Sequence, residues 1–194
     1  MTGADSAEPA AGKRCFLALL PAPAPLRILA RCREKLQRSL TGAPRGARWL
    51  EPETLHLTLR FLGESTQAQI EYLDHMLPTL AAELAPLATR RFGVWPNRAR
   101  PRLLVLELDV SPILSELVDR CEQQALKAGF AADPRRFRPH ITLARLRPGC
   151  AFGNLSGPPP TIAFDAIALM QSSLARPAAT YRELARTPLH GRLG

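Results

Sequence analysis

His56-Leu57-Thr58-Leu59 and His140-Ile141-Thr142-Leu143 are two copies of one tetrad in the same chain. The chain has 4 histidines, and two of them begin these copies. Each copy lies in an apolar run typical of a strand, where residues i and i+2 share a face. Each run therefore presents one imidazole beside one hydroxyl, while its aliphatic residues face the core. We expect the two strands to face each other and to place both pairs around one small cleft.

The size and composition of the chain indicate a globular protein. With 194 residues and 46% hydrophobic content, the chain suits one domain or two small lobes. No apolar run approaches the roughly 20 residues that a membrane helix needs. The net charge is +9, and arginine supplies most of the positive charge. This balance fits a polyanionic partner such as RNA, although arginine-rich composition is equally typical of a GC-rich genome.

The cysteines give no sign of a metal or redox site. Cys15, Cys32, Cys121 and Cys150 show none of the short spacings of a zinc or redox motif. We interpret them as reduced thiols in a cytoplasmic protein. We also see no cluster of metal-ligating residues, so we expect neither a metal nor another cofactor.

The order of periodic segments predicts an α+β fold. A flexible tail over residues 1–12 should precede a single domain over 13–188, with a short C-terminal tail over 189–194. Each half of this domain should carry a helix followed by a tetrad strand, which indicates two similar lobes with antiparallel sheets that face each other. The expected helices cover residues 25–39, 66–84 and 112–127, and the expected strands cover 14–20, 55–62, 87–94, 103–108, 138–146, 161–171 and 181–186.

The duplication is what makes the tetrad informative. A single strand histidine followed by threonine is more often structural than functional. Two copies in similar context, each with an aliphatic residue before the threonine and leucine after it, are hard to attribute to coincidence. Two imidazoles and two hydroxyls in one cleft can bind a phosphate and move two protons.

Around these tetrads the chain resembles a known family. The similarity lies in Trp49-Leu50 with His56–Glu64, in Arg138–Arg145, in Phe92–Pro96 with Arg100–Arg102, and in the opening Arg14–Leu19. These segments resemble the two-histidine (2H) phosphoesterases, in particular the bacterial RNA 2′,3′-cyclic phosphodiesterases, also called 2′-5′ RNA ligases. The resemblance implies a bilobal 2H phosphoesterase fold with two pseudo-symmetric lobes and helices on the outside. Residues 177–180 depart from the family, which often has a glycine shortly before the position of Tyr181.

The chemistry expected of the tetrads is opening of a cyclic phosphodiester. A neutral imidazole can take a proton from water while an imidazolium protonates the departing ribose oxygen. The pseudo-symmetry of the residues leaves these roles open, but the resemblance implies His56 as the general acid and His140 as the general base. Thr58 and Thr142 should donate hydrogen bonds to the two non-bridging phosphate oxygens.

Three further side chains are candidates for binding substrate. Phe61 and Arg145 lie five positions after the histidines and can sandwich a nucleobase. Strict alternation places both on the opposite face, so they reach the cleft only if the strands end, twist or bulge. Core packing of Phe61 and a solvated Arg145 are the alternatives. Arg60 should share the face of His56 and Thr58 and reach phosphate or the RNA backbone, or else form a surface salt bridge.

These residues favour an enzyme that hydrolyses RNA or nucleotide 2′,3′-cyclic phosphate ends to 2′-phosphates, with 2′-5′ RNA ligation as the possible reverse reaction. The alternatives are a non-catalytic module that binds RNA or nucleotides, and a phosphodiesterase for another small cyclic phosphate such as ADP-ribose 1″,2″-cyclic phosphate. We expect a monomer with RNA or 2′,3′-cyclic nucleotides as partners and no contact with membranes. Trp49, Trp95 and Tyr181 are expected to serve packing.

Overall fold

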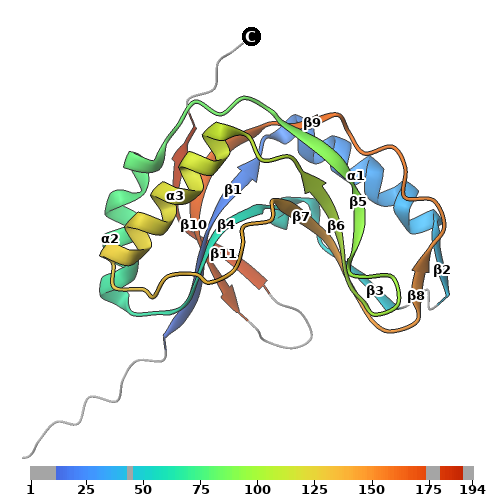
Figure 1. The fold of residues 1–194 in the computed structure, drawn as a ribbon, viewed down its shortest axis with the longest axis horizontal. Helices are drawn as coiled ribbons and strands as arrows, with labels where there is room; N and C mark the ends of the chain where they lie inside the picture. The colour runs from blue at the N-terminus through green and yellow to red at the C-terminus, as the bar shows by residue number, and fades with distance from the viewer. Residues whose placement is uncertain (1–11, 43–45, 174–179, 190–194) are drawn as a thin grey trace, which may run out of the picture.

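The computed structural model describes residues 12–42, 46–173 and 180–189. Most of the two predicted tails lies outside these ranges. Residues 177–179, which belong to the segment that departs from the family pattern, also lie outside them. The α+β prediction is confirmed, since three helices combine with a largely antiparallel sheet (Figure 1). The helices are α1 (Pro23–Arg38), α2 (Gln67–Met76) and α3 (Pro112–Lys127), with 3-10 turns at Pro52–Thr54 (η2) and Leu77–Leu80 (η3). The strands are β1 (Lys13–Pro21), β2 (Leu40–Gly42), β3 (Ala47–Trp49), β4 (Leu57–Ser65), β5 (Leu87–Pro96), β6 (Pro101–Leu108), β7 (His140–Leu146), β8 (Cys150–Phe152), β9 (Thr161–Ile162), β10 (Phe164–Ser173) and β11 (Thr180–Pro188).

Local sequence explains where the helices begin and end. Ser111 caps α3 by accepting a hydrogen bond from the backbone N–H of Leu114, and Thr66 forms a capping box with Gln69 at the start of α2. The helix α2 is shorter than the predicted 66–84. It gives way to η3 because Pro78 has no N–H to donate and its ring crowds the carbonyl of the preceding turn.

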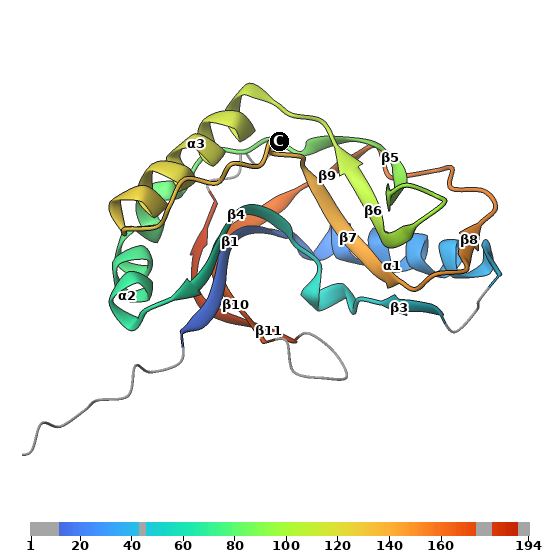
Figure 2. The same ribbon diagram turned by 60° about the horizontal axis from the view of Figure 1, so that its bottom comes forward.

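Strands β2 and β8 pair with each other, and the other strands form one sheet with a narrow junction in the middle. The order is β11-β10-β1-β4-β7-β6-β5-β9, with β3 paired to β7. Within each half the neighbouring strands pair along most of their length, but β4 and β7 pair only at Leu57 and Ile141. The sheet therefore consists of two antiparallel halves joined at one residue pair, and Figure 2 shows the halves curving away on either side of β4 and β7.

Each helix that precedes a tetrad strand in the chain covers the half of the sheet that holds the other tetrad strand. Figures 1 and 2 place α2 and α3 outside the half that contains β1, β4 and β10, whereas α1 lies along the half that contains β6 and β7. In the chain α3 precedes β7, but it packs against β4. Likewise α1 precedes β4, but it lies along the half that contains β7. The expectation that a lobe contains its own preceding helix is therefore wrong.

One apolar core fills the space between the sheet and the helices. Leu57 and Ile141 are both fully buried in this core, as are Leu29 of α1 and Leu117 of α3. Leu189 also packs into it, although it lies one residue beyond the predicted domain boundary at 188. The four cysteines are buried and outside any disulfide, and this burial is expected for Cys15, Cys32 and Cys121, which stand in place of apolar residues.

A bulge follows the threonine of each tetrad. In the β1–β4 ladder Ala18 is opposite Thr58 and Leu17 is opposite Arg60, which leaves Leu59 as an extra residue. Two consecutive residues of β4 therefore face the core, and the next residue, Phe61, returns to the face of Thr58. This is the usual effect of a bulge on side-chain alternation.

The second tetrad has the same irregularity at the equivalent residue. In the β6–β7 ladder Val105 is opposite Thr142 and Leu104 is opposite Ala144, so that Leu143 is the extra residue. Arg145 is thereby returned to the face of Thr142. Phe61 and Arg145 were expected to reach the cleft only if their strands end, twist or bulge. Both strands bulge, so both residues can reach it.

The bulge in β4 also determines the environment of Arg60. Its side chain faces the helices, is only 7% exposed, and forms an ion pair with Glu122 of α3. It also donates to the backbone carbonyls of Phe61 and Ala131 and lies 3.9 Å from the carboxylate of Asp133. The prediction that Arg60 shares the face of His56 is therefore wrong, because the extra residue Leu59 turns the Arg60 side chain to the opposite face of β4.

The Arg60 network gives the first testable prediction. Arg60→Met should lower the free energy of unfolding by about 3 kcal/mol, because it leaves Glu122 partly buried without its cation and removes the more distant of the two cations beside Asp133. Urea denaturation followed by circular dichroism measures this loss. Arg31→Met is the matched control, since Arg31 is exposed on α1, and it should change stability by less than about 0.5 kcal/mol. Equal stability of the two variants would contradict a structural role for Arg60.

Candidate active site

The junction between the two halves brings the tetrads together. Leu57 and Ile141 pair in antiparallel register and face the core. Continuing this register by one residue in each direction places His56 nearest to Thr142, and Thr58 nearest to His140. The two imidazoles and two hydroxyls thus share the face of the sheet that is turned away from the core.

These groups line one cleft of about 420 Å³. Six of the seven predicted site residues border it, and only Arg60 does not. Its polar and charged lining comes from both halves of the sheet, and aromatic side chains line it as well. The lining residues are Arg14, Phe16, His56, Thr58, Phe61, Trp95, Leu103, His140, Thr142, Arg145, Ser172 and Tyr181.

Both imidazoles are held in the same way by the backbone. The Nδ1 of His56 lies 2.8 Å from the carbonyl oxygen of Thr54, and the Nδ1 of His140 lies 2.8 Å from that of Arg138. In each case Nδ1 must carry the proton in order to donate to a carbonyl. The Nε2 atoms are therefore the ones available to the cleft, where each can accept a proton when the ring is neutral.

The surroundings of His56 are aromatic. Its ring centroid lies 4.8 Å from that of Phe16 and 5.0 Å from that of Tyr181. Burial lowers the pKa of His56 from 6.5 to about 4, against the opposing effect of the hydrogen bond to Thr54. The charges of His140 and Arg145 lower the pKa further. Without a bound anion His56 is thus neutral at pH 7.

The surroundings of His140 contain a carboxylate. Its ring centroid lies 4.4 Å from that of Trp95, and it is opposite Glu107 in the β6–β7 ladder. Burial lowers the pKa of His140 and the nearby charge of Arg138 lowers it further, whereas the carbonyl of Arg138 and the charge of Glu107 raise it. The two histidines therefore have similar backbone contacts but different electrostatic surroundings.

Glu107 links several parts of this second half. It is 9% exposed and accepts hydrogen bonds from the indole N–H of Trp95 at 2.7 Å and from Nε of Arg91 at 3.0 Å. Burial raises the pKa of Glu107, but these hydrogen bonds and the charge of Arg91 more than offset that effect and keep the pKa below its usual range. A Cβ on Gly93 would lie 2.7 Å from the carboxylate, so glycine leaves the space that the Glu107 side chain occupies.

Several residues that border the cleft were not predicted from the sequence. Trp95 and Tyr181 were expected to serve packing, but Trp95 lies against His140, and the hydroxyl of Tyr181 accepts a hydrogen bond from Arg145 at 3.1 Å. Phe16 and Arg14 of β1 also border the cleft. Only Phe16 gave a usable signal, because alternation places it on the face of β1 opposite to the core residues Leu17 and Leu19.

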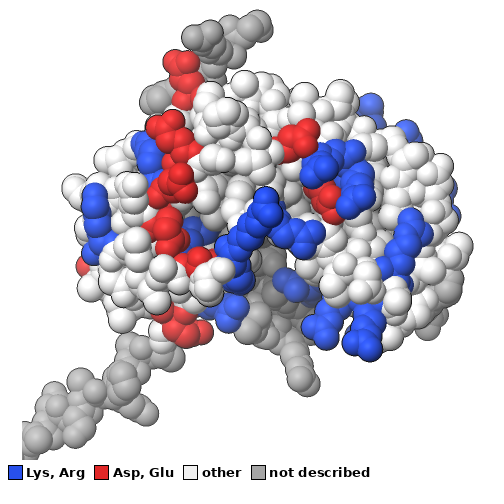
Figure 3. All heavy atoms as spheres, in the orientation of Figure 1, with Lys and Arg blue, Asp and Glu red and all other residues white. Residues whose placement is uncertain are grey.

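Charge is unevenly distributed over the molecule. Figure 3 shows acidic side chains mainly over the half covered by α2 and α3, whereas basic side chains gather around the central hollow and on the other half. Arg14 and Arg145 border the cleft itself. Such a distribution favours the approach of an anionic ligand to the cleft.

No three histidine, cysteine, aspartate or glutamate side chains in the described ranges are grouped as ligands of a metal ion. No helix in these ranges is long and apolar enough to cross a membrane.

Comparison with known proteins identifies the family. A family profile described as LigT like Phosphoesterase matches residues 20–105 and 107–181. The chain belongs to this family. The crystal structure of Escherichia coli LigT complexed with 3′-AMP is similar over 92% of this chain and 98% of that one, with a TM-score of 0.69 and 28% identity.

Curated relatives of this LigT-like phosphoesterase carry one name. The protein named RNA 2′,3′-cyclic phosphodiesterase of Bacillus subtilis is 36% identical over 100 residues, which are 50% of this chain and 55% of that protein. The protein of the same name from Escherichia coli is 30% identical over 151 residues, 75% of this chain and 82% of that protein. The chain thus spans about half the length of the Bacillus relative, and 32% of a Geobacillus stearothermophilus relative.

The carboxylate beside His140 gives the second prediction. Glu107→Gln should lower the pKa of His140, because the negative charge that favours the imidazolium is removed while a hydrogen bond to Trp95 remains possible. The pKa of His56 should stay where it is. Titration of the imidazole resonances by NMR measures both values. Glu51→Gln, which breaks an exposed ion pair with Arg33, should leave both unchanged. An unaltered His140 titration in Glu107→Gln would show that this charge does not act on the imidazole.

Proposed function

We propose that this chain hydrolyses the 2′,3′-cyclic phosphodiester ends of RNA or nucleotides to 2′-phosphates by paired histidine acid–base catalysis without a metal ion. The observation that carries the proposal is the arrangement of the tetrads. His56 and His140 border one cleft, each with Nδ1 bound to a backbone carbonyl and Nε2 left for the ligand. The name shared by the curated relatives supports the same substrate.

In the proposed reaction His140 is the base and His56 is the acid. His140 takes a proton from water as the water oxygen bonds to phosphorus, and the bond from phosphorus to O3′ breaks. His56 gives its proton to O3′, which leaves the phosphate on O2′. His140 borders a neighbouring hollow as well as the cleft, which leaves room for a water, whereas the ring of His56 lies against Phe16 and Tyr181. This geometry supports the same order that the resemblance implies.

Threonines and flanking side chains would hold the substrate. Thr58 and Thr142 lie beside the imidazoles, from where their hydroxyls would donate to the non-bridging phosphate oxygens. Phe61 and Arg145 border the same cleft, which supports their predicted role on either side of a nucleobase. The hydroxyl of Tyr181 would fix the guanidinium of Arg145 in that position.

The low pKa of His56 in the free protein implies that a bound substrate is needed to protonate this imidazole. Because the pKa of His56 is about 4, most molecules hold it neutral at pH 7. A phosphodiester anion in the cleft would raise the pKa of the adjacent imidazole, since an opposite charge favours the protonated form. The pH optimum of kcat, which reports the bound state, should therefore lie above that of kcat/KM, which reports the free protein.

Two related activities follow from the same groups. A ribose 5′-hydroxyl in place of water would give a 2′-5′ linkage, and the high concentration of water makes hydrolysis the dominant outcome. A non-catalytic binding module would not need both Nε2 atoms free, so the geometry favours an enzyme. ADP-ribose 1″,2″-cyclic phosphate also carries a base and a strained diester, and it belongs in the substrate panel. The monomeric state and the cytoplasmic location stay predictions.

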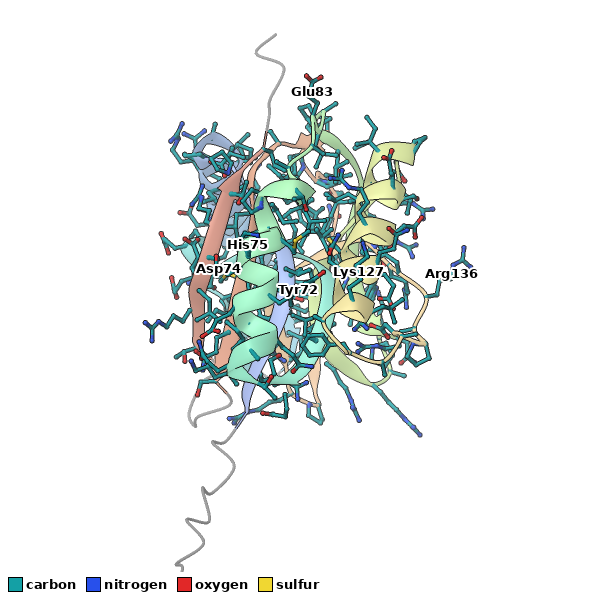
Figure 4. All side chains as sticks on the ribbon, turned by 90° about the vertical axis from the view of Figure 1, so that its left-hand side faces the viewer. Tyr72, Asp74, His75, Glu83, Lys127 and Arg136 are labelled. Carbon is teal, nitrogen blue, oxygen red and sulfur yellow. The ribbon has the colours of Figure 1, made fainter. Side chains whose placement is uncertain are left out.

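The third prediction tests the activity directly. The protein in EDTA should convert adenosine 2′,3′-cyclic phosphate to adenosine 2′-phosphate, and His56→Ala and His140→Ala should each lower kcat by 10²-fold or more, within the usual range for loss of a general acid or base. Chromatography resolves the 2′ and 3′ products. His75→Ala is the matched control, because His75 is exposed on α2 (Figure 4) and does not line the cleft. Activity that disappears in EDTA, or persists in either active-site variant, would contradict the proposal.

The fourth prediction separates acid from base. A substrate with sulfur in place of the bridging O3′ has a leaving group that needs no protonation, so it should restore most of the rate lost in His56→Ala. The same substrate should restore little in His140→Ala, where activation of water is missing. Single-turnover rates with the oxygen and sulfur substrates give the comparison. Restoration in His140→Ala instead would reverse the two roles.

A further inference from the structure

A second hollow opens beside the catalytic cleft, and the proposed reaction uses only the part of it next to His140, where a water has room. Its volume is about 370 Å³, and it shares Thr58, Phe61, Trp95 and His140 with the cleft. Because these four residues border both spaces, the second hollow lies directly beside the cleft, next to a ligand held between the histidines.

The lining of this hollow combines flat apolar surfaces with arginines. Leu59, Phe61, Trp95 and Phe137 provide the apolar part. Residues 135–138 form the far side and carry three arginines, of which Arg136 extends outward from the loop in Figure 4. Aromatic faces beside guanidinium groups are the combination that binds single-stranded nucleic acid, since bases stack on rings and phosphates pair with arginine.

Two of these arginines are fixed in different ways. Arg135 lies 5.1 Å from the centre of the Phe61 ring, but its charge is paired with Asp133 at 2.8 Å. Arg138 lies 3.9 Å from the centre of the Trp95 ring and forms no salt bridge within the described ranges. Arg138 is exposed, and its charge helps to lower the pKa of Glu107 without a salt bridge to that carboxylate. A planar cation held on an indole in this way is well placed to bind a phosphate.

The position of Arg138 suggests which phosphate. Arg138 borders the second hollow and two further hollows that Trp95 also lines. Arg138 does not line the cleft itself, but its guanidinium lies on Trp95, which borders both the cleft and the second hollow. A ribose whose 2′ and 3′ oxygens are held between the histidines has only its 5′ oxygen left to carry the chain onward.

We propose that this hollow binds the nucleotide that precedes the cyclic-phosphate nucleoside in an RNA chain, with Arg138 on the phosphate that joins the two. The proposal rests on the function proposed above and makes it more specific. The preceding base stacks against the apolar lining, while Phe61 separates it from the terminal base. The preferred substrates are therefore oligonucleotide ends, and cyclic mononucleotides fill only part of the site.

The fifth prediction tests this with three substrates of increasing length. These are adenosine 2′,3′-cyclic phosphate, the same compound with a 5′-phosphate, and the dinucleotide ApA with a 2′,3′-cyclic phosphate end. The added phosphate should raise kcat/KM by a factor that falls with salt, because it forms an ion pair with Arg138. The added nucleoside should raise it by a further factor of about ten through stacking.

Variants separate the second hollow from the catalytic groups. Arg138→Ala should reduce the advantage of the two longer substrates over the mononucleotide by about tenfold. Arg31→Ala removes the same charge from an exposed position on α1 and should keep the advantage. Equal kcat/KM for all three substrates in the wild-type protein would overturn the proposal. An equal loss on all three substrates in Arg138→Ala would also overturn it, since Arg138 would then act through Trp95 and His140.

Binding measurements distinguish failure of the inference from failure of the proposed function. If none of the cyclic phosphates is turned over, the proposed function fails, and the second hollow is then judged by affinity. Calorimetry with adenosine 2′-phosphate and with ApA carrying a 2′-phosphate end should show about tenfold tighter binding of the dinucleotide. That difference should disappear in Arg138→Ala and persist in Arg31→Ala. Equal affinities in the wild-type protein would overturn the assignment of the hollow.

Discussion

The pairing of Leu57 with Ile141 is the contact on which the site depends. It is the only residue pair that joins β4 to β7, and both side chains are fully buried. The buried pair turns the flanking histidines and threonines to the other face and brings the two tetrads side by side. Because the strands separate on either side of this pair, the sheet opens into a cleft there. A longer ladder would close that space, and no pairing would leave two unrelated surfaces.

The two bulges extend this constraint to the residues that would hold a substrate. Leu59 and Leu143 are the extra residues, and both are buried in the core. A bulge that carries a leucine is anchored by the burial of that side chain, which opposes slippage of the strand into regular register. The bulge in β4 places Phe61 at the cleft, and the equivalent bulge in β7 places Arg145 there. The pseudo-symmetry thus extends beyond the tetrads to the backbone that follows them.

The sequence predicts those features of the site that depend on neighbours in the chain. The face shared by His56 and Thr58 follows from strand alternation alone. The place of Arg60 does not, because the bulge that reverses it depends on the register with β1 and on a carboxylate from α3. The helices are exchanged between halves for a similar reason, since packing partners distant in sequence decide which side a helix covers. Tyr181 and Trp95 reach the cleft only through pairing of strands that the sequence does not specify.

The departures from symmetry explain how a symmetric pair could do asymmetric chemistry. His56 lies among aromatic rings, so its proton depends on the charge of a bound anion. His140 has the carboxylate of Glu107 on the neighbouring strand and borders a second hollow that admits solvent. A proton on His56 is therefore favoured only while a phosphate is present, whereas His140 is placed to receive one from water. On this view the rings of Phe16 and Tyr181 and the carboxylate of Glu107, rather than the tetrads themselves, determine the direction in which protons move.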